Sequence, residues 1–136
     1  MVQPIVKDPF ILSRKSDPAT NRDQDVIRDL EDTLRAQQDH CIGMAANMIG
    51  QLKRIMIVSD GTAPLILVNP KILAKSDPYH TEEGCLSLEG VRPVTRYQKI
   101  TVSFQDKKFR KQKKTFTGIL AQAIQHEYDH MDGILI

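Results

Sequence analysis

Two histidines and a glutamate near the end of the chain form the pattern His-Glu-x-x-His, at His126, Glu127 and His130. On a helix, residues four positions apart lie on the same face, so both imidazoles can bind one metal ion. Glu127 projects beside them, close enough to take a proton from a metal-bound water molecule. The alternative is a chance arrangement of polar residues on a solvated helix face. The preceding residues favour the metal site, because apolar side chains recur there at helical spacing: Ile119, Leu120, Ala123 and Ile124.

A catalytic metal site usually has three protein ligands and one open position, so a third ligand is needed. No Cys, His or Glu follows His130, and Asp132 is too close in sequence to complete the site easily. Some His-Glu-x-x-His hydrolases have a third histidine at the position of Ile136. We therefore expect the third ligand upstream, at Cys85, because a thiolate binds zinc or ferrous iron strongly. Taken alone, Cys85 would be interpreted as a small buried apolar residue.

Three sequence blocks together resemble those of peptide deformylases. Glu83–Ser87 reads Glu-Gly-Cys-Leu-Ser, and Gln125–His130 contains Gln-His-Glu-x-x-His. The upstream block Cys41–Met48 reads Cys-Ile-Gly-Met-Ala-Ala-Asn-Met and corresponds to the family pattern G-φ-G-φ-A-A-x-Q. The blocks stand in the family's order and span most of the chain. By this resemblance, the chain is identified as a member of the peptide deformylase family.

The resemblance implies a ligand set of Cys85, His126 and His130, with Glu127 as general base and then general acid. The implied cofactor is one divalent metal ion, Fe2+ in the cell, with Zn2+, Ni2+ or Co2+ as alternatives. The implied substrate is a peptide or nascent chain that begins with N-formyl-methionine, and the products are formate and a free amine. A general metallopeptidase is the less favoured hypothesis, because no downstream ligand is present.

The resemblance also implies donors for the negative charge that develops on the formyl oxygen. In the family these are the backbone N–H after the ligand cysteine, here Leu86, and a glutamine amide. The glutamine position is Met48 in this chain, and a thioether cannot donate a hydrogen bond. Losing one such donor typically lowers turnover about 100- to 1000-fold. Backbone groups at Ile42, Gly43 and Gly84 are expected to pair with the substrate as an added strand.

The Met48 substitution leaves two hypotheses open. One is a deformylase with reduced activity, which the complete ligand set and Glu127 favour. The other is a relative with little or no catalytic activity that binds metal and peptide N-termini in a regulatory role. A gain of formyl release on restoring the glutamine would distinguish the first from the second.

Length and composition are those of a small globular protein. The 136 residues and 15.4 kDa suffice for one buried core, so we expect residues 1–136 to form a single metal-hydrolase domain. The net charge of +2 does not indicate nucleic-acid binding, so we expect no DNA partner. No apolar run approaches the length of a membrane span, so we expect no membrane partner. Met1–Leu12 lacks the apolar run of a signal peptide, and Cys85 must stay reduced if it is a metal ligand. Each of these features favours a location in the cytoplasm.

The elements expected around these residues give an α+β fold, which the resemblance also implies: short, mostly antiparallel strands around the C-terminal His-Glu-x-x-His helix. An apolar stripe predicts a second helix near the N-terminus, from Asn21 to His40. Residues 1–20 are expected to form an extended arm. Alternation and apolar runs predict strands over 54–58, 65–68, 71–75, 96–104 and 115–117. Turn-forming residues predict breaks at Asn69-Pro70, Asp77-Pro78 and Gly90–Pro93.

The segment 107–114 is strongly basic, with six cations in eight residues: Lys107, Lys108, Arg110, Lys111, Lys113 and Lys114. Such a run usually forms a solvated hairpin tip that discourages edge-to-edge pairing of sheets. The alternative is contact with ribosomal RNA phosphates, which would suit an enzyme that acts on nascent chains.

Overall fold

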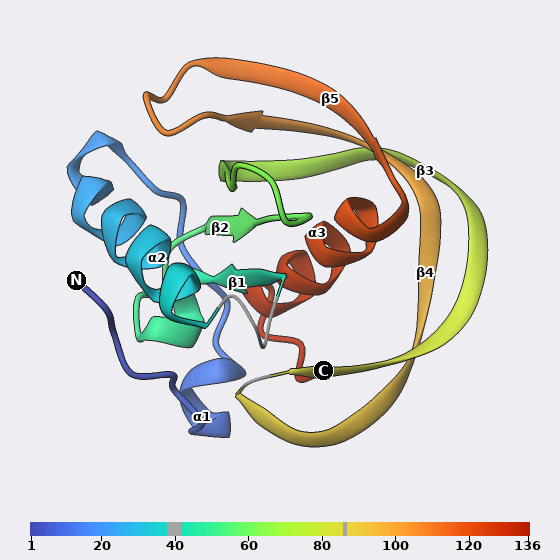
Figure 1. Cartoon of the computed structure of the whole chain (residues 1–136), viewed down its shortest axis with the longest axis horizontal. Coiled ribbons are helices and arrows are strands. Elements are labelled where there is room, and N and C mark those ends of the chain that lie inside the picture. Colours follow the sequence, from blue (N-terminus) through green and yellow to red (C-terminus); the bar gives the residue numbers. More distant parts are fainter. Residues whose placement is uncertain (38–41, 86) are drawn as a thin grey trace.

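A computed structural model describes residues 1–37, 42–85 and 87–136, which form one antiparallel sheet with helices on both sides. Figure 1 shows β1 and β2 between α2 and α3, while the long strands β3 and β4 curve around α3. The strand order is β1-β2-β3-β4-β5, and the strands are β1 (Gly43–Ala45), β2 (Ile55–Val58), β3 (Leu65–Cys85), β4 (Leu88–Gln105) and β5 (Lys111–Thr117). The helices are α1 (Pro9–Leu12), α2 (Gln24–Ala36) and α3 (Gly118–Met131), with short 3-10 helices η1 (Asn21–Asp23) and η2 (Ala46–Ile49).

Strand β2 is buried along its whole length because helices cover both faces of the sheet at this point. Strand alternation places Ile55 and Ile57 in the hydrophobic cluster that contains the α2 residues. Met56 and Val58 lie in the second cluster, which contains the α3 residues. The two clusters therefore fix α2 and α3 on opposite faces of β2, and this places the His-Glu-x-x-His helix next to the sheet.

The predicted N-terminal helix is confirmed as α2, although it is shorter than predicted. Its entry is the 3-10 helix η1, where the Thr20 N–H donates to the Asp23 carboxylate at 2.8 Å. Residues 38–40 of the predicted helix lie outside the described residues. The extended arm predicted for residues 1–20 contains the one-turn helix α1, which Asp8 caps and Pro9 begins. In the described part of the chain, no helix combines the length and apolarity needed to cross a membrane.

Strands β3 and β4 are long, which corrects the prediction of short strands separated by turns. β3 runs through both Asn69-Pro70 and Asp77-Pro78 as one strand of 21 residues. Asn69 and Asp77 have left-handed φ angles of 50° and 61°, and the pairing register shifts between Val68 and Lys71. Turn-forming residues here produce irregularities within a paired strand, and such irregularities bend a sheet. Gly90–Pro93, also predicted as a turn, lies within β4.

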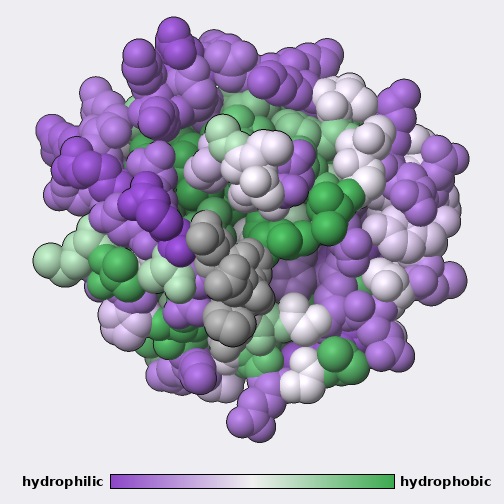
Figure 2. Space-filling model, in the orientation of Figure 1, coloured by the Kyte–Doolittle hydropathy of each residue, from purple (hydrophilic) through white to green (hydrophobic). Residues whose placement is uncertain are grey.

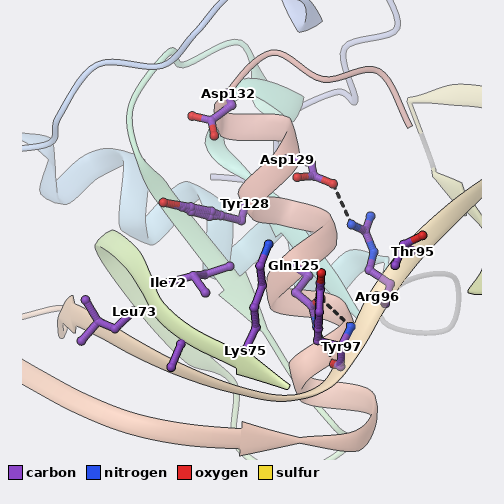
Figure 3. Close-up of a pocket in the computed structure, with 11 residues that line it drawn as sticks. Ile72, Leu73, Lys75, Thr95, Arg96, Tyr97, Gln125, Tyr128, Asp129 and Asp132 are labelled. Carbon is purple, nitrogen blue, oxygen red and sulfur yellow. Dashed lines mark hydrogen bonds and ion pairs between the residues drawn. The ribbon is translucent and has the colours of Figure 1, made fainter. Parts of the chain in front are cut away.

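Gln125 attaches α3 to β4 through its side-chain amide. Its Nε2 donates to the Tyr97 carbonyl at 2.8 Å, and its Oε1 accepts from the Tyr97 N–H at 2.9 Å, as a neighbouring strand would. Figure 3 shows this contact in a cavity between α3 and the β3–β4 hairpin, where Arg96 also reaches Asp129. The Gln125 side chain is buried, so both hydrogen bonds are shielded from water.

Replacing Gln125 with methionine preserves most of the side-chain volume but leaves the N–H and C=O of Tyr97 without these partners. We expect the free energy of unfolding to fall by about 1–3 kcal/mol, because buried peptide groups left unpaired are destabilising. Urea denaturation measures the change. Gln98→Met, at an exposed position on β4, is the control and should change stability by less than about 0.5 kcal/mol. Equal losses in the two variants would contradict the role of Gln125.

Candidate metal centre

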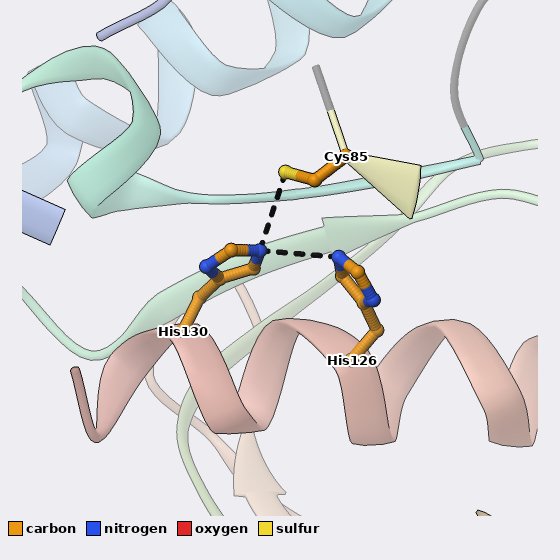
Figure 4. Close-up of side chains that lie close together, drawn as sticks. All are labelled: Cys85, His126 and His130. Carbon is orange, nitrogen blue, oxygen red and sulfur yellow. Dashed lines mark hydrogen bonds between the residues drawn. The ribbon is translucent and has the colours of Figure 1, made fainter. Parts of the chain in front are cut away.

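Cys85, His126 and His130 come together in the structure, from the end of β3 and from adjacent turns of α3 (Figure 4). The Cys85 Sγ lies 3.3 Å from the His130 Nε2, and the Nε2 atoms of the two histidines are 3.1 Å apart. One ligand atom from each of the three residues lies within 4.8 Å of the others. Ligands at about 2.0–2.3 Å from a tetrahedral ion are spaced on this scale.

The chemistry of these three side chains fits a divalent cation. One thiolate and two imidazoles form a donor set that zinc, iron, cobalt and nickel accept. His126 uses its Nδ1 for the Glu83 carboxylate at 2.8 Å, which leaves its Nε2 facing the other two ligands. His130 is fully buried, and its Nδ1 has no hydrogen-bond partner among the described residues. Three ligands leave a fourth position for water or substrate.

Glu83 is the centre of a buried hydrogen-bond network behind His126. Arg96 donates to Glu83 at 2.7 Å, Gln122 donates to it at 2.8 Å, and a second Arg96 nitrogen donates to Asp129 at 2.7 Å. Glu83 and Arg96 form an ion pair in which both side chains are buried. Burial alone would raise the pKa of Glu83, but the hydrogen bonds from His126, Arg96 and Gln122 lower it to about 2. Glu83 is therefore a carboxylate at neutral pH and orients the His126 ring.

Glu127 lies on α3 beside the ligands, and its carboxyl group is buried. Its Oε1 has no hydrogen-bond partner in the described part of the chain. Burial raises the pKa of Glu127 to about 7, so the carboxyl group can both accept and release a proton near neutral pH. Gly43 of β1 lies against it: a Cβ at this position would come within 3.0 Å of the Glu127 Oε2. The glycine therefore allows β1 and the Glu127 carboxylate to approach closely.

Neither Asn47 nor Met48 of the first sequence block offers a free side-chain amide to a substrate. Met48 is buried in the hydrophobic cluster that contains the α2 residues, and its Sδ accepts from the Ala45 N–H at 3.5 Å. Asn47 is fully buried and donates to the His130 carbonyl at 2.9 Å. The Asn47 amide therefore holds η2 to α3, and Met48 has no hydrogen to donate. Cys41 lies outside the described residues.

The residues expected to pair with a substrate lie at strand ends. Gly43 is in β1, which ends the strand order and pairs with β2 alone among the described strands. The Ile42 carbonyl accepts from the Ser59 N–H at 2.9 Å, so the sheet already uses this acceptor. Gly84 pairs with Val91 at the end of β3, directly before Cys85. Leu86, the expected backbone donor, lies outside the described residues.

Two members of the network around Glu83, Gln122 and Asp129, were not predicted from the sequence. A signal for Gln122 was available, because it lies four residues before His126 and so shares its helix face. No sequence pattern indicated the role of Asp129. Its partner Arg96 is 33 residues away in the sequence, and only the curvature of the β3–β4 hairpin around α3 brings the two together.

Comparison with known proteins identifies the family of this chain. The polypeptide deformylase family model matches residues 2–136, and a peptide deformylase from Clostridium beijerinckii is 52% identical over 136 residues, which is the whole of both chains. The chain belongs to the polypeptide deformylase family. Peptide deformylase 1 from Clostridium perfringens is 38% identical over 134 residues, and the match covers 94% of the present chain and 90% of that protein.

Solved deformylase structures share the fold of this family member. The Acinetobacter baumannii peptide deformylase with bound Met-Ala-Ser matches with a TM-score of 0.89 and 26% identity, covering 99% of this chain and 97% of that one. A peptide deformylase from Legionella pneumophila matches with a TM-score of 0.89 and 32% identity, covering 99% and 83%. The α+β fold with a C-terminal His-Glu-x-x-His helix, predicted for this deformylase relative, is therefore confirmed.

Replacing Glu83 with glutamine removes the negative charge that holds the His126 Nδ1. We expect the metal affinity of this deformylase-family site to fall about 10- to 100-fold, as is typical when the partner of a metal-binding histidine is lost. Competition with a chromophoric chelator for Zn2+ measures the affinity, and circular dichroism establishes that each variant is folded. Glu82→Gln, an exposed neighbour on β3, is the control and should leave the affinity unchanged. An unchanged affinity in Glu83→Gln would contradict this role.

Proposed function

We propose that this chain is a metal-dependent peptide deformylase that removes the formyl group from N-formyl-methionine at the start of nascent polypeptides. The observation that carries the proposal is the convergence of Cys85, His126 and His130 with the buried Glu127 beside them. The names of its relatives and the Met-Ala-Ser peptide in the Acinetobacter baumannii enzyme support it. We treat residues 1–136 as one domain, because a single sheet connects the elements from β1 to β5 and packs against α2 and α3.

In this proposal, the Cys85 Sγ and the Nε2 atoms of His126 and His130 hold one divalent metal ion. We propose Fe2+ in the cell, with Zn2+, Ni2+ or Co2+ able to take its place in the same donor set. When bound, such an ion supplies Lewis acidity and lowers the pKa of a water molecule toward about 7. The cysteine has to remain a reduced thiolate to act as a ligand, which supports a cytoplasmic location.

Glu127 acts in this scheme as the group that moves the proton. Its carboxylate takes a proton from the attacking water molecule and then delivers a proton to the leaving amine. Ile42, Gly43 and Gly84 supply backbone groups for the peptide, which would join the sheet as an additional strand. The place of β1 supports this arrangement, because it pairs with β2 alone among the described strands and its Gly43 lies close to Glu127.

The formyl oxygen needs donors where its negative charge develops, and we assign this role to the Leu86 N–H. Met48 occupies the position of the second donor without being able to donate, so we expect lower turnover than in a deformylase with glutamine there. The second candidate function is a metal-containing protein that binds peptide N-termini without turnover. The buried, donor-free Met48 side chain is the observation that favours this alternative.

We also propose that the basic segment 107–114 contributes to contact with the ribosome. Two of its cations are already paired, since Lys107 lies 3.6 Å from Glu31 and Arg110 lies 3.0 Å from Asp106. The lysines that remain for an external partner are Lys108, Lys111, Lys113 and Lys114, all of them exposed.

Formate release from formyl-Met-Ala-Ser tests the main proposal, with anaerobically purified protein of known metal content. We expect measurable turnover in the natural protein and a loss of about 100- to 10,000-fold in Glu127→Ala, because the proton carrier is removed. Glu89→Ala, at an exposed position on β4, is the control and should keep its activity. A fully metallated natural protein that released no formate would favour the second candidate function.

Replacing Met48 with glutamine tests the missing donor. We expect turnover to rise by about 100-fold, because one restored donor at the oxyanion is typically associated with an effect of this size. Met48→Leu is the matched control, since leucine fills similar space without a donor and should leave turnover within a few-fold. If the glutamine variant is folded and metallated but gains nothing, Met48 is not what limits this site.

A further inference from the structure

The outer face of strands β3, β4 and β5, directed away from α3, carries lysines and short hydroxyl side chains. Ile100, Val102, Phe104 and Phe116 are buried in the cluster that contains the α3 residues, so the alternate positions of the strands face outward. Figure 2 shows hydrophilic side chains along the upper edge of the molecule, where β5 lies in Figure 1. We call this surface the basic face, and its members are Lys71, Lys99, Thr101, Ser103, Lys111, Lys113 and Thr115.

The strand register places these residues in rows across the sheet. Lys71 on β3 and Lys113 on β5 flank Ser103 on β4, because both pair with it. Adjacent strands lie about 5 Å apart, so the backbones at these two lysines are about 10 Å apart. Lys111 is the next outward position along β5, about 7 Å from Lys113. Lys99 extends the face along β4, so cations from three strands share one surface.

The charge of the basic face is not neutralised within the protein. Its members include no carboxylate, and none of its four lysines forms an ion pair with the described residues. Residues 97–117 contain seven Lys and Arg but only one acidic residue, Asp106, although the whole chain has a net charge of just +2. Asp106 lies in the turn before β5 and is engaged by Arg110 at 3.0 Å. The positive charge of the chain is therefore concentrated on this end of the sheet.

We propose that the basic face binds the phosphate backbone of double-stranded RNA. Lysines at these spacings can contact several phosphates, and the hydroxyls of Thr101, Ser103 and Thr115 can bond to phosphate oxygens and ribose 2′-hydroxyls. The aromatic rings of Phe104 and Phe116 are buried on the opposite face, so this face offers no platform for stacking unpaired bases. Its members are lysines and hydroxyl side chains, and Leu73, two residues after Lys71 on β3, adds only one exposed aliphatic side chain, which is too little to insert into a membrane.

This inference goes beyond the hairpin tip, because Lys71 and Lys99 come from β3 and β4, and it does not rest on the proposed deformylase activity. Binding to a short fluorescent RNA duplex, measured by anisotropy, tests it. Four phosphate contacts predict an affinity that falls about 100-fold between about 50 and about 200 mM salt. An affinity that does not respond to salt would overturn the proposal.

Two matched variants locate the binding surface. The first replaces the four lysines of the basic face with glutamine: Lys71→Gln, Lys99→Gln, Lys111→Gln and Lys113→Gln. The control removes the same charge from exposed positions outside this sheet, with Lys7→Gln, Arg14→Gln, Lys15→Gln and Arg22→Gln. We expect the first variant to lose at least about tenfold in affinity and most of its salt dependence, and the control to remain within about threefold. Circular dichroism establishes that both are folded.

Three results would overturn the proposal. Equal losses in the two variants would mean that net charge alone governs binding. A DNA duplex of the same sequence that bound as tightly as the RNA would remove the assignment to RNA. Binding to phosphatidylserine vesicles, lost in the basic-face variant while the RNA duplex failed to bind, would assign the face to an anionic membrane surface.

Discussion

The carboxylate of Glu83 is buried, and the arrangement of β3, β4 and α3 depends on satisfying its charge. A carboxylate removed from water is strongly destabilising unless it is paired and hydrogen-bonded. Arg96 provides the pairing from β4, and Gln122 and His126 provide hydrogen bonds from α3. Since Glu83 precedes Cys85 by two residues on β3, the contacts that satisfy its charge also fix the position of Cys85 relative to His126. The same buried contacts therefore hold the polar core together and position the candidate metal ligands.

The hydrophobic clusters complete this arrangement from the other side of the helix. The ligand-bearing helix α3 is apolar where it meets the sheet, with Ala121, Ile124 and Met131 in its cluster. Its polar residues lie around the remaining surface, where they meet β3, β4 and η2. Burial of the apolar face sets the rotation of the helix, and that rotation presents His126 and His130 to Cys85.

The sequence was sufficient to predict the parts of this site that depend on local patterns. The spacing of His126 and His130 follows from helix geometry alone, and their grouping with Cys85 followed from the resemblance to a family. The strand lengths could not be predicted, because Asn69 and Asp77 favour turns locally but are held within β3 by its pairing with β4. The direction of the Met48 sulfur and the Arg96–Asp129 contact depend on packing between distant segments, which no local pattern encodes.

The close approach of Gly43 to Glu127 has a kinetic consequence. The strand that would align a peptide lies so close to the carboxylate that would transfer the proton that a Cβ at position 43 would come within 3.0 Å of the Glu127 Oε2. In the proposed reaction, a peptide ordered along β1 would be held at a constant distance from the Glu127 carboxylate. Reacting groups held in this way behave as if present at very high effective concentration, since the entropy of bringing them together is lost on binding. At position 43, a single methyl group would be enough to disturb that alignment.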